Sequence, residues 1–213
     1  MFEVIPGILE KGWDQIEQKI ELILPFAKTV HIDIVDGKFA PNTTFLDPKP
    51  FAKYKDKIFL ELHLMVDNPV EYLKPWADAG FKRFIGQIEK MPDQVEFVAQ
   101  GQLLGEVGLA IDGPTSPEEL KIPLEDLDTV LVMTIKAGFS GQSFNPEYLK
   151  KIREILKQVQ NDKVSIEVDG GINDQTIKLA RDAGANRFSA TSFIYKEDPK
   201  TQFQKLNSLI HDY

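Results

Sequence analysis

The chain has 213 residues, no cysteine and a formal net charge of −8 at pH 7. The negative charge disfavours nucleic acid as a partner, because the phosphates would be repelled. Without cysteine, histidine and carboxylates are the available metal ligands. The start of the chain has no basic segment typical of a signal peptide, and no apolar run approaches 18 residues, so we expect a cytoplasmic protein without a membrane partner.

Short β-rich runs alternate with helical patterns along the whole chain. Strands are expected at residues 2–9, 29–34, 58–65, 83–85, 107–111, 129–135, 164–168 and 187–190. Helices are expected at residues 13–27, 49–54, 70–79, 93–100, 117–120, 146–160, 174–183 and 199–210. This order predicts parallel strands in a (β/α)8 TIM barrel, formed as a single domain over residues 1–213, with a doubly wound open sheet as the alternative.

Three of the expected strands carry polar side chains at alternating positions. His31 and Asp33 share one face of their strand, and His63 and Met65 share a face with Glu61 on the next one. Glu167 and Asp169 share a face in the seventh strand. We expect these faces to point to the barrel axis, with the apolar residues between them facing the helices. The polar set lies toward the carboxyl ends of the strands, where barrel active sites are found.

Two histidines and two aspartates converge in this arrangement: His31, Asp33, His63 and Asp169. A single strand histidine is more often a core residue with its own partner, and an aspartate at a strand end more often caps a turn. Four separate explanations of that kind each require a buried partner, whereas one divalent metal satisfies all four residues. The third histidine, His211, is expected to be solvated.

Glycine-rich or hydroxyl-bearing segments follow the last three strands. Free backbone amides after late strands of a barrel often bind phosphate, and ordinary turns are the alternative. Lys136 is the nearest candidate for a side-chain contact. The expected substrate-binding residues are Gly138, Phe139, Ser140, Gly141 and Gln142, then Gly170 and Gly171, then Thr191 and Ser192. Met65 and Met133 are expected near the barrel mouth, where core packing also explains them.

Four segments resemble the ribulose-phosphate 3-epimerase family in order and spacing, across essentially the whole chain. They are HIDIVDG at 31–37 with Pro41-Asn42, HLMV at 63–66, VMTIKAGFSGQSF at 132–144 and EVDGGI at 167–172. The resemblance implies a TIM barrel and an epimerase that interconverts ribulose 5-phosphate and xylulose 5-phosphate, a reaction of the pentose phosphate pathway. We also expect the chain to form a homo-oligomer.

The same resemblance implies roles for particular residues. One divalent metal, zinc first and iron, manganese or cobalt as alternatives, would be bound by His31, Asp33, His63 and Asp169. Asp33 and Asp169 would exchange protons with C3 of the ketose phosphate from opposite faces, through an enediolate. The two methionines, Met65 and Met133, would line the site around that intermediate.

Several positions depart from the family pattern. Gly7 stands where the family usually has serine, and Thr191-Ser192 stands where the family usually has a Gly-Ser pair. Other departures are Val35, Lys136-Ala137 and Gly86-Gln87. A hexulose 6-phosphate is therefore an alternative substrate, and a barrel that has lost catalysis and serves in binding or regulation is a further alternative. Orotidine-monophosphate-decarboxylase-like barrels need Asp-x-Lys-x-x-Asp, and the segment beginning at Asp33 lacks its central lysine.

Overall fold

Eight parallel strands form a closed barrel in the structure, a computed structural model that describes residues 2–139, 141–158 and 163–211. Each strand pairs with the next in the chain, and β8 pairs with β1. The predicted (β/α)8 TIM barrel is confirmed. The strands are β1 (Glu3–Ile8), β2 (Thr29–Val35), β3 (Phe59–Met65), β4 (Arg83–Gln87), β5 (Glu106–Ile111), β6 (Thr129–Met133), β7 (Ser165–Asp169) and β8 (Arg187–Ala190).

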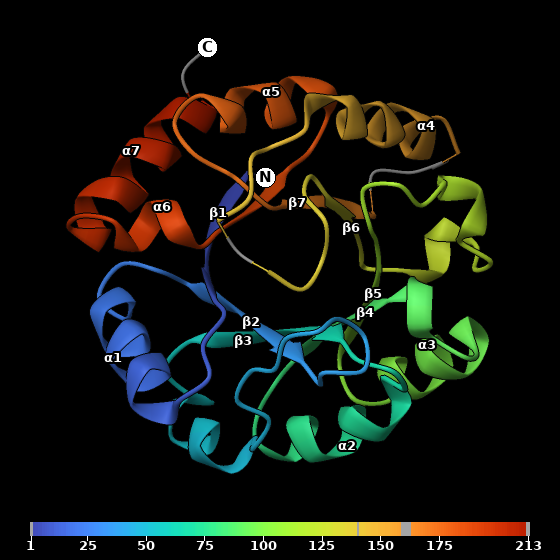
Figure 1. Cartoon of the computed structure of the whole chain (residues 1–213), viewed down its shortest axis with the longest axis horizontal. Coiled ribbons are helices and arrows are strands. Elements are labelled where there is room, and N and C mark those ends of the chain that lie inside the picture. Colours follow the sequence, from blue (N-terminus) through green and yellow to red (C-terminus); the bar gives the residue numbers. More distant parts are fainter. Residues whose placement is uncertain (1, 140, 159–162, 212–213) are drawn as a thin grey trace.

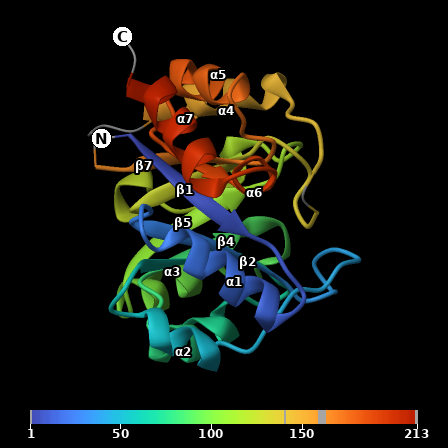
Figure 2. The same cartoon turned by 90° about the vertical axis from the view of Figure 1, so that its left-hand side faces the viewer.

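Helices form a ring around these strands (Figure 1). They are α1 (Trp13–Ile23), α2 (Val70–Asp78), α3 (Gln94–Gln102), α4 (Lys150–Gln158), α5 (Thr176–Ala183), α6 (Ser192–Tyr195) and α7 (Pro199–His211). Short 3-10 helices fill several connections: η1 (Lys49–Tyr54), η2 (Ile88–Lys90), η3 (Pro117–Glu119), η4 (Leu124–Asp126) and η5 (Pro146–Leu149). In the side view, α5 and α7 cover the barrel opposite α2 (Figure 2).

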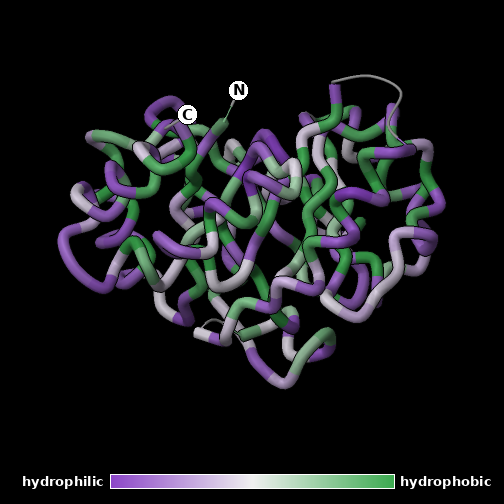
Figure 3. Tube along the Cα trace, turned by 90° about the horizontal axis from the view of Figure 1, so that it is seen from above, coloured by the Kyte–Doolittle hydropathy of each residue, from purple (hydrophilic) through white to green (hydrophobic). Residues whose placement is uncertain are grey.

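The alternation of the strands sorts side chains between two environments. Ile32 and Ile34 of β2, with Leu62 and Leu64 of β3, are fully or almost fully buried and pack outward in the layer between strands and helices. Burying each such side chain contributes roughly 1.5–3 kcal/mol of transfer free energy. Figure 3 shows hydrophobic and hydrophilic stretches alternating along the chain, with hydrophilic loops at the edges of the molecule. The intervening polar residues of the same strands are left to face the barrel axis.

Several predicted boundaries are wrong by a few residues. The helix expected to reach Ala27 ends at Ile23, because Pro25 has no N–H to continue the hydrogen-bond ladder, although Leu24 keeps helical backbone. The strand expected to end at Ile85 continues to Gln87, and the sixth strand ends at Met133. The helix expected over 146–160 divides into η5 and α4, and residues 159 and 160 lie outside the described residues.

One α-helix was not predicted at all. Thr191 and Ser192 were expected in a loop, but Ser192 begins α6, a helix of four residues that is too short to show a periodic pattern. Within the described residues, no helix is long and apolar enough to cross a membrane.

Candidate active site

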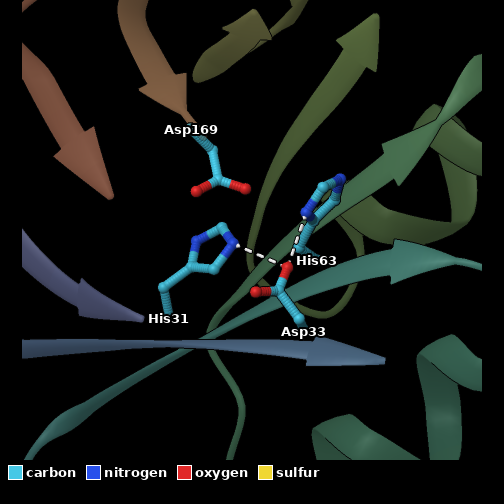
Figure 4. Close-up of side chains that lie close together, drawn as sticks. All are labelled: His31, Asp33, His63 and Asp169. Carbon is cyan, nitrogen blue, oxygen red and sulfur yellow. Dashed lines mark hydrogen bonds and ion pairs between the residues drawn. The ribbon is translucent and has the colours of Figure 1, made fainter. Parts of the chain in front are cut away.

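The four predicted metal ligands converge inside the carboxyl end of the barrel (Figure 4). His31 and Asp33 project from β2, and His63 projects from β3 at the register position of Asp33. Asp169, the last residue of β7, points toward them from the other side of the barrel. All four are buried, and each offers a ligand atom within 4.8 Å of the others.

One oxygen of Asp33 contacts both imidazoles. Asp33 Oδ1 lies 2.9 Å from His63 Nδ1 and 3.3 Å from His31 Nε2. The opposite ring nitrogens have partners of their own: His31 Nδ1 lies 2.6 Å from Glu61 Oε1, and His63 Nε2 lies 2.8 Å from Gln87 Oε1. Because a carboxylate and an amide oxygen only accept hydrogen bonds, these outer nitrogens are protonated. In the metal-free protein the inner nitrogens also face a carboxylate oxygen, so they donate protons to Asp33 Oδ1, and a bound metal would take the place of these protons.

Glu61 belongs to a charged layer beneath the site. Its second oxygen accepts a hydrogen bond from Arg83, which also donates from Nε to Glu106 Oε2 at 2.7 Å. Glu167 Oε1 lies 3.2 Å from His31 Nδ1, but the proton of that nitrogen is already given to Glu61. Neither oxygen of Glu167 has a hydrogen-bond partner among the described residues. His31, Glu61 and Glu167 also have metal-like spacing, but Arg83 already supplies a cation there.

The surroundings in this layer give Glu61 and Glu167 very different pKa values. Burial acts to raise the pKa of Glu61, but its hydrogen bond with His31 and the charge of Arg83 lower that pKa to about 2. Burial raises the pKa of Glu167 to about 7, and repulsion from Glu61 adds to the effect. Burial acts to lower the pKa of His31, but Asp33 and the two glutamates raise it well above 6.5.

The pKa values of the two aspartates also differ strongly. Burial acts to raise the pKa of Asp33, but His31 and His63 hold it well below its usual range. Burial, together with repulsion from Asp33, raises the pKa of Asp169 to about 6. At a pH below about 6, Asp33 is ionised while Asp169 keeps its proton. The metal-free site then contains one base and one acid.

The donor set fits a divalent metal of the zinc type. It offers two imidazole nitrogens that point inward and two carboxylates, all buried, which is the ligand chemistry that such a metal prefers. The outer nitrogens are held by a carboxylate and an amide, as is usual for metal-binding histidines. Gln87 was not predicted as a site residue, and Glu61 was predicted only to share the inward face.

A cavity connects this centre with the glycine-rich segments. It is lined by Asp33, Asp169, Met65 and Met133 together with most of the predicted substrate-binding residues: Gly138, Phe139, Gly141, Gly170, Gly171, Thr191 and Ser192. Gly170 and Gly171 both have positive φ, at 108° and 67°, which other residues rarely adopt. The loop after β6 lies across the open end of the barrel (Figure 1).

Two predicted contact residues are not on this cavity. The Gln142 side-chain amide donates to the backbone oxygens of Lys136 and Phe139, at 2.6 and 2.8 Å, so it closes its own loop. Lys136 is exposed and does not line the cavity. Ser140 lies outside the described residues. Asp36 is a turn residue, since its carboxylate accepts from the amides of Lys38 and Phe39.

Other residues near the cavity were missed by the sequence reasoning. Asn42 donates to the backbone oxygen of Gly138 at 2.9 Å and so ties the loop after β2 to the loop after β6. Lys196, at the end of α6, lines a neighbouring hollow with Gly141, Gly171 and Ser192. His211 is exposed, as predicted, and stands edge-on to the ring of Phe2.

Comparison with known proteins identifies the family. The sequence profile of the ribulose-phosphate 3 epimerase family matches residues 3–195. The chain belongs to the ribulose-phosphate 3-epimerase family. Two curated members are the ribulose-phosphate 3-epimerase of Schizosaccharomyces pombe and the cytoplasmic isoform of Oryza sativa subsp. japonica. The first is 32% identical, covering 98% of this chain and 93% of the relative, and the second is 34% identical, covering 91% and 87%.

The expectation that this epimerase-family chain is an isomerase-type enzyme is thereby confirmed. Among solved structures, the 3-hexulose-6-phosphate synthase of Salmonella typhimurium superposes with a TM-score of 0.71 at 15% identity, covering 98% of both chains. At that identity, the likeness to the synthase concerns the fold alone.

Proposed function

We propose that the chain interconverts ribulose 5-phosphate and xylulose 5-phosphate by moving a proton at C3. One observation carries this proposal: Asp33 and Asp169 extend toward each other from opposite sides of the barrel mouth, with two histidines between them. Inverting a carbon that bears a proton requires removal of that proton on one face and its return on the other. Two carboxylates that flank one carbon are suited to this task.

In the proposed reaction Asp33 and Asp169 exchange roles with direction. The ionised carboxylate removes the C3 proton, and the protonated carboxylate on the opposite face returns a proton to C3. Met65 and Met133, both almost fully buried, exclude water beside the reacting carbon. His31 and His63 hold Asp33 in position through their hydrogen bonds to Oδ1.

We propose that the four ligands His31, Asp33, His63 and Asp169 hold one divalent metal, with zinc favoured. When bound, such a metal stabilises negative charge that develops on the substrate oxygens. The backbone amides around Gly138, Gly141, Gly170, Gly171, Thr191 and Ser192 are proposed to hold the phosphate, because these residues line the same cavity and no lysine or arginine is among its described lining residues.

The test is a panel of pentulose and hexulose phosphates incubated with the metal-loaded protein in D₂O and followed by NMR. We expect deuterium at C3 and the epimeric product from ribulose 5-phosphate. Faster turnover of a hexulose 6-phosphate would transfer the proposal to that substrate, and an absence of exchange from every ketose phosphate would refute it and favour a binding or regulatory role. The unphosphorylated ketose is the control for the phosphate site.

We also propose that the chain forms one domain over residues 1–213, assembles as a homo-oligomer and acts in the cytoplasm. Light scattering of the purified protein and localisation of a tagged chain test the last two statements.

A further inference from the structure

Gly7 is a glycine for reasons of space. It lies inside β1, beside His31 in the register, and its φ is not positive. A Cβ added to Gly7 would stand 2.3 Å from Thr191 Oγ1 and 3.0 Å from Ser189 Oγ. The first distance is far below van der Waals contact, so the glycine leaves the room that the Thr191 hydroxyl occupies. Two hydroxyl groups from β8 and its loop therefore converge on one point of β1.

Neither hydroxyl has a structural task that explains this position. Ser189 is 1% exposed, and its oxygen makes no hydrogen bond within the described part of the chain. Ser189 pairs in register with Asp169 on β7, and its nearby hydroxyl acts to lower the pKa of that carboxyl. The two side chains are nevertheless not within hydrogen-bond geometry. Thr191 precedes α6, but its side chain does not cap the helix. The buried Ser189 hydroxyl without a partner is costly, which indicates that a ligand brings polar groups to this place, and the half-buried Thr191 lines the cavity beside it.

Both residues line the cavity that runs from the aspartates to the glycine-rich segments. Ser189 adjoins Asp169 in the register, and Thr191 adjoins Ser192 at the other end of this run. In a ketose 5-phosphate with C3 between the aspartates and the phosphate on the glycine segments, C4 and C5 lie in between, and this placement brings C4 beside Thr191. In an extended sugar chain that carbon carries a hydroxyl group.

We propose that Thr191 is a specificity-determining residue whose hydroxyl, admitted by Gly7 and backed by Ser189, binds the C4 hydroxyl of the ketose phosphate. This inference rests on the proposed function, because it takes the position of the sugar from it. It assigns Thr191 a side-chain contact with the sugar in addition to the phosphate contact of its backbone amide.

The test compares ribulose 5-phosphate with its 4-deoxy analogue in the metal-loaded enzyme. We expect Thr191→Val to lower kcat/KM about 10-fold for the natural ketose and to leave the analogue within about twofold, since one hydrogen bond to a neutral group is lost. Thr191→Ser keeps the hydroxyl and should keep the discrimination. Thr29→Val is the matched control: it removes a buried hydroxyl at the opposite end of the barrel, where Thr29 donates to Glu3.

The packing argument has its own test. Gly7→Ala turns the Thr191 hydroxyl away and should reduce discrimination as Thr191→Val does. The double variant Gly7→Ser with Thr191→Gly presents a hydroxyl from β1 instead. It should restore part of the discrimination between ribulose 5-phosphate and its 4-deoxy analogue. Melting temperatures follow the same coupling without any substrate: Gly7→Ala should destabilise the chain with Thr191 and not the chain with glycine at 191.

Three results would overturn the inference. Equal losses of Thr191→Val on both substrates, or weaker inhibition by inorganic phosphate in that variant, would make Thr191 a phosphate contact only. If an active Thr191→Val variant still discriminated between ribulose 5-phosphate and its 4-deoxy analogue as the wild type does, the Thr191 hydroxyl would make no contact with the C4 hydroxyl. The proposed function would remain intact. If the wild-type protein exchanged no C3 proton of any ketose phosphate, the proposed function would fail, and the sugar contact would fall with it.

Discussion

Removing the partner of one histidine tests whether the centre is built for a metal. Gln87 Oε1 accepts from His63 Nε2 at 2.8 Å, and both side chains are fully buried. In Gln87→Leu, the Nε2 proton either stays without a partner, at about 1–3 kcal/mol, or is the proton that His63 loses, which leaves a proton on Nδ1, the nitrogen that would bind the metal. Both outcomes weaken the site. Loss of such an outer partner typically lowers metal affinity about 10–100-fold, or about 1.4–2.7 kcal/mol, which agrees with the first figure.

The assay is calorimetric titration of the metal-free protein with zinc, with a competing chelator to bring the affinity into range. Gln87→Glu keeps an acceptor and adds negative charge, so its affinity should equal or exceed that of the native protein. The matched control is Gln94→Leu, because Gln94 is also a buried glutamine with two hydrogen bonds, to Glu119 and Lys121, but lies on α3. It should lose stability and keep its zinc affinity.

Two results would refute this reasoning. If Gln87→Leu bound zinc within twofold of the native affinity, the hydrogen bond to His63 would be irrelevant to the site. If Gln94→Leu lost as much affinity as Gln87→Leu, the effect would come from general destabilisation of the barrel rather than from the position of the imidazole.

Two further predictions concern the carboxylates. Asp33→Asn and Asp169→Asn should each lower epimerisation by several orders of magnitude, while each retains C3 deuterium exchange into one epimer, a different epimer for each variant. Near-native epimerisation by either metal-loaded variant would make that aspartate a ligand only. In the chelator-treated protein, Glu167 has a pKa of about 7 in the fold against its usual 4.5, so stability present below the lower value is lost as the pH rises through the higher one. Glu167→Gln should therefore raise the free energy of unfolding by up to about 3 kcal/mol at pH 8 and by little at pH 4, measured by urea denaturation. The exposed Glu147→Gln is the control, and equal effects of Glu167→Gln at both pH values would contradict the prediction.

The strand pattern of the sequence was sufficient to bring the four central residues together. His31 and Asp33 are two apart, as are the inward positions of every strand, and the same alternation places His63 and Asp169. The order of strands and helices was sufficient for the barrel, because parallel neighbours joined by crossover helices leave few topologies. Pairing distances and hydrogen-bond partners depend on the third dimension and were not accessible in this way.

Gln87 shows why part of the site was missed. The strand was expected to end at Ile85, because Gly86 interrupts the β-rich run. In the structure Gly86 is part of β4, and a Cβ there would stand 2.5 Å from Met91 and 2.7 Å from Phe97. The glycine therefore allows close packing on the outer face and does not break the strand. Continuing the inward alternation from Arg83 through Ile85 would have reached Gln87.

The two imidazoles use different nitrogens toward the site for a reason that lies in the register. In each ring the nitrogen nearer the backbone, Nδ1, contacts the lateral neighbour: His31 pairs in register with Glu61, and His63 with Asp33. The more distant nitrogen, Nε2, reaches one layer further toward the mouth, to Asp33 and Gln87 respectively.

Because His63 lies one layer above His31, the same rule places Nδ1 of one ring and Nε2 of the other beside Asp33. The residues that accept from the outer nitrogens, Glu61 and Gln87, therefore differ in charge between the deeper and the shallower layer. The deeper ring has the ionised Glu61, whose charge Arg83 balances, and the shallower ring has a neutral amide close to the cavity. A carboxylate at position 87 would add an uncompensated negative charge among buried residues, and a neutral amide at position 61 would leave Arg83 without its buried partner. Each histidine is therefore matched to its support by the charge of its own layer, which is why exchanging the two supports should destabilise the metal-free barrel even though both accept the same hydrogen bond.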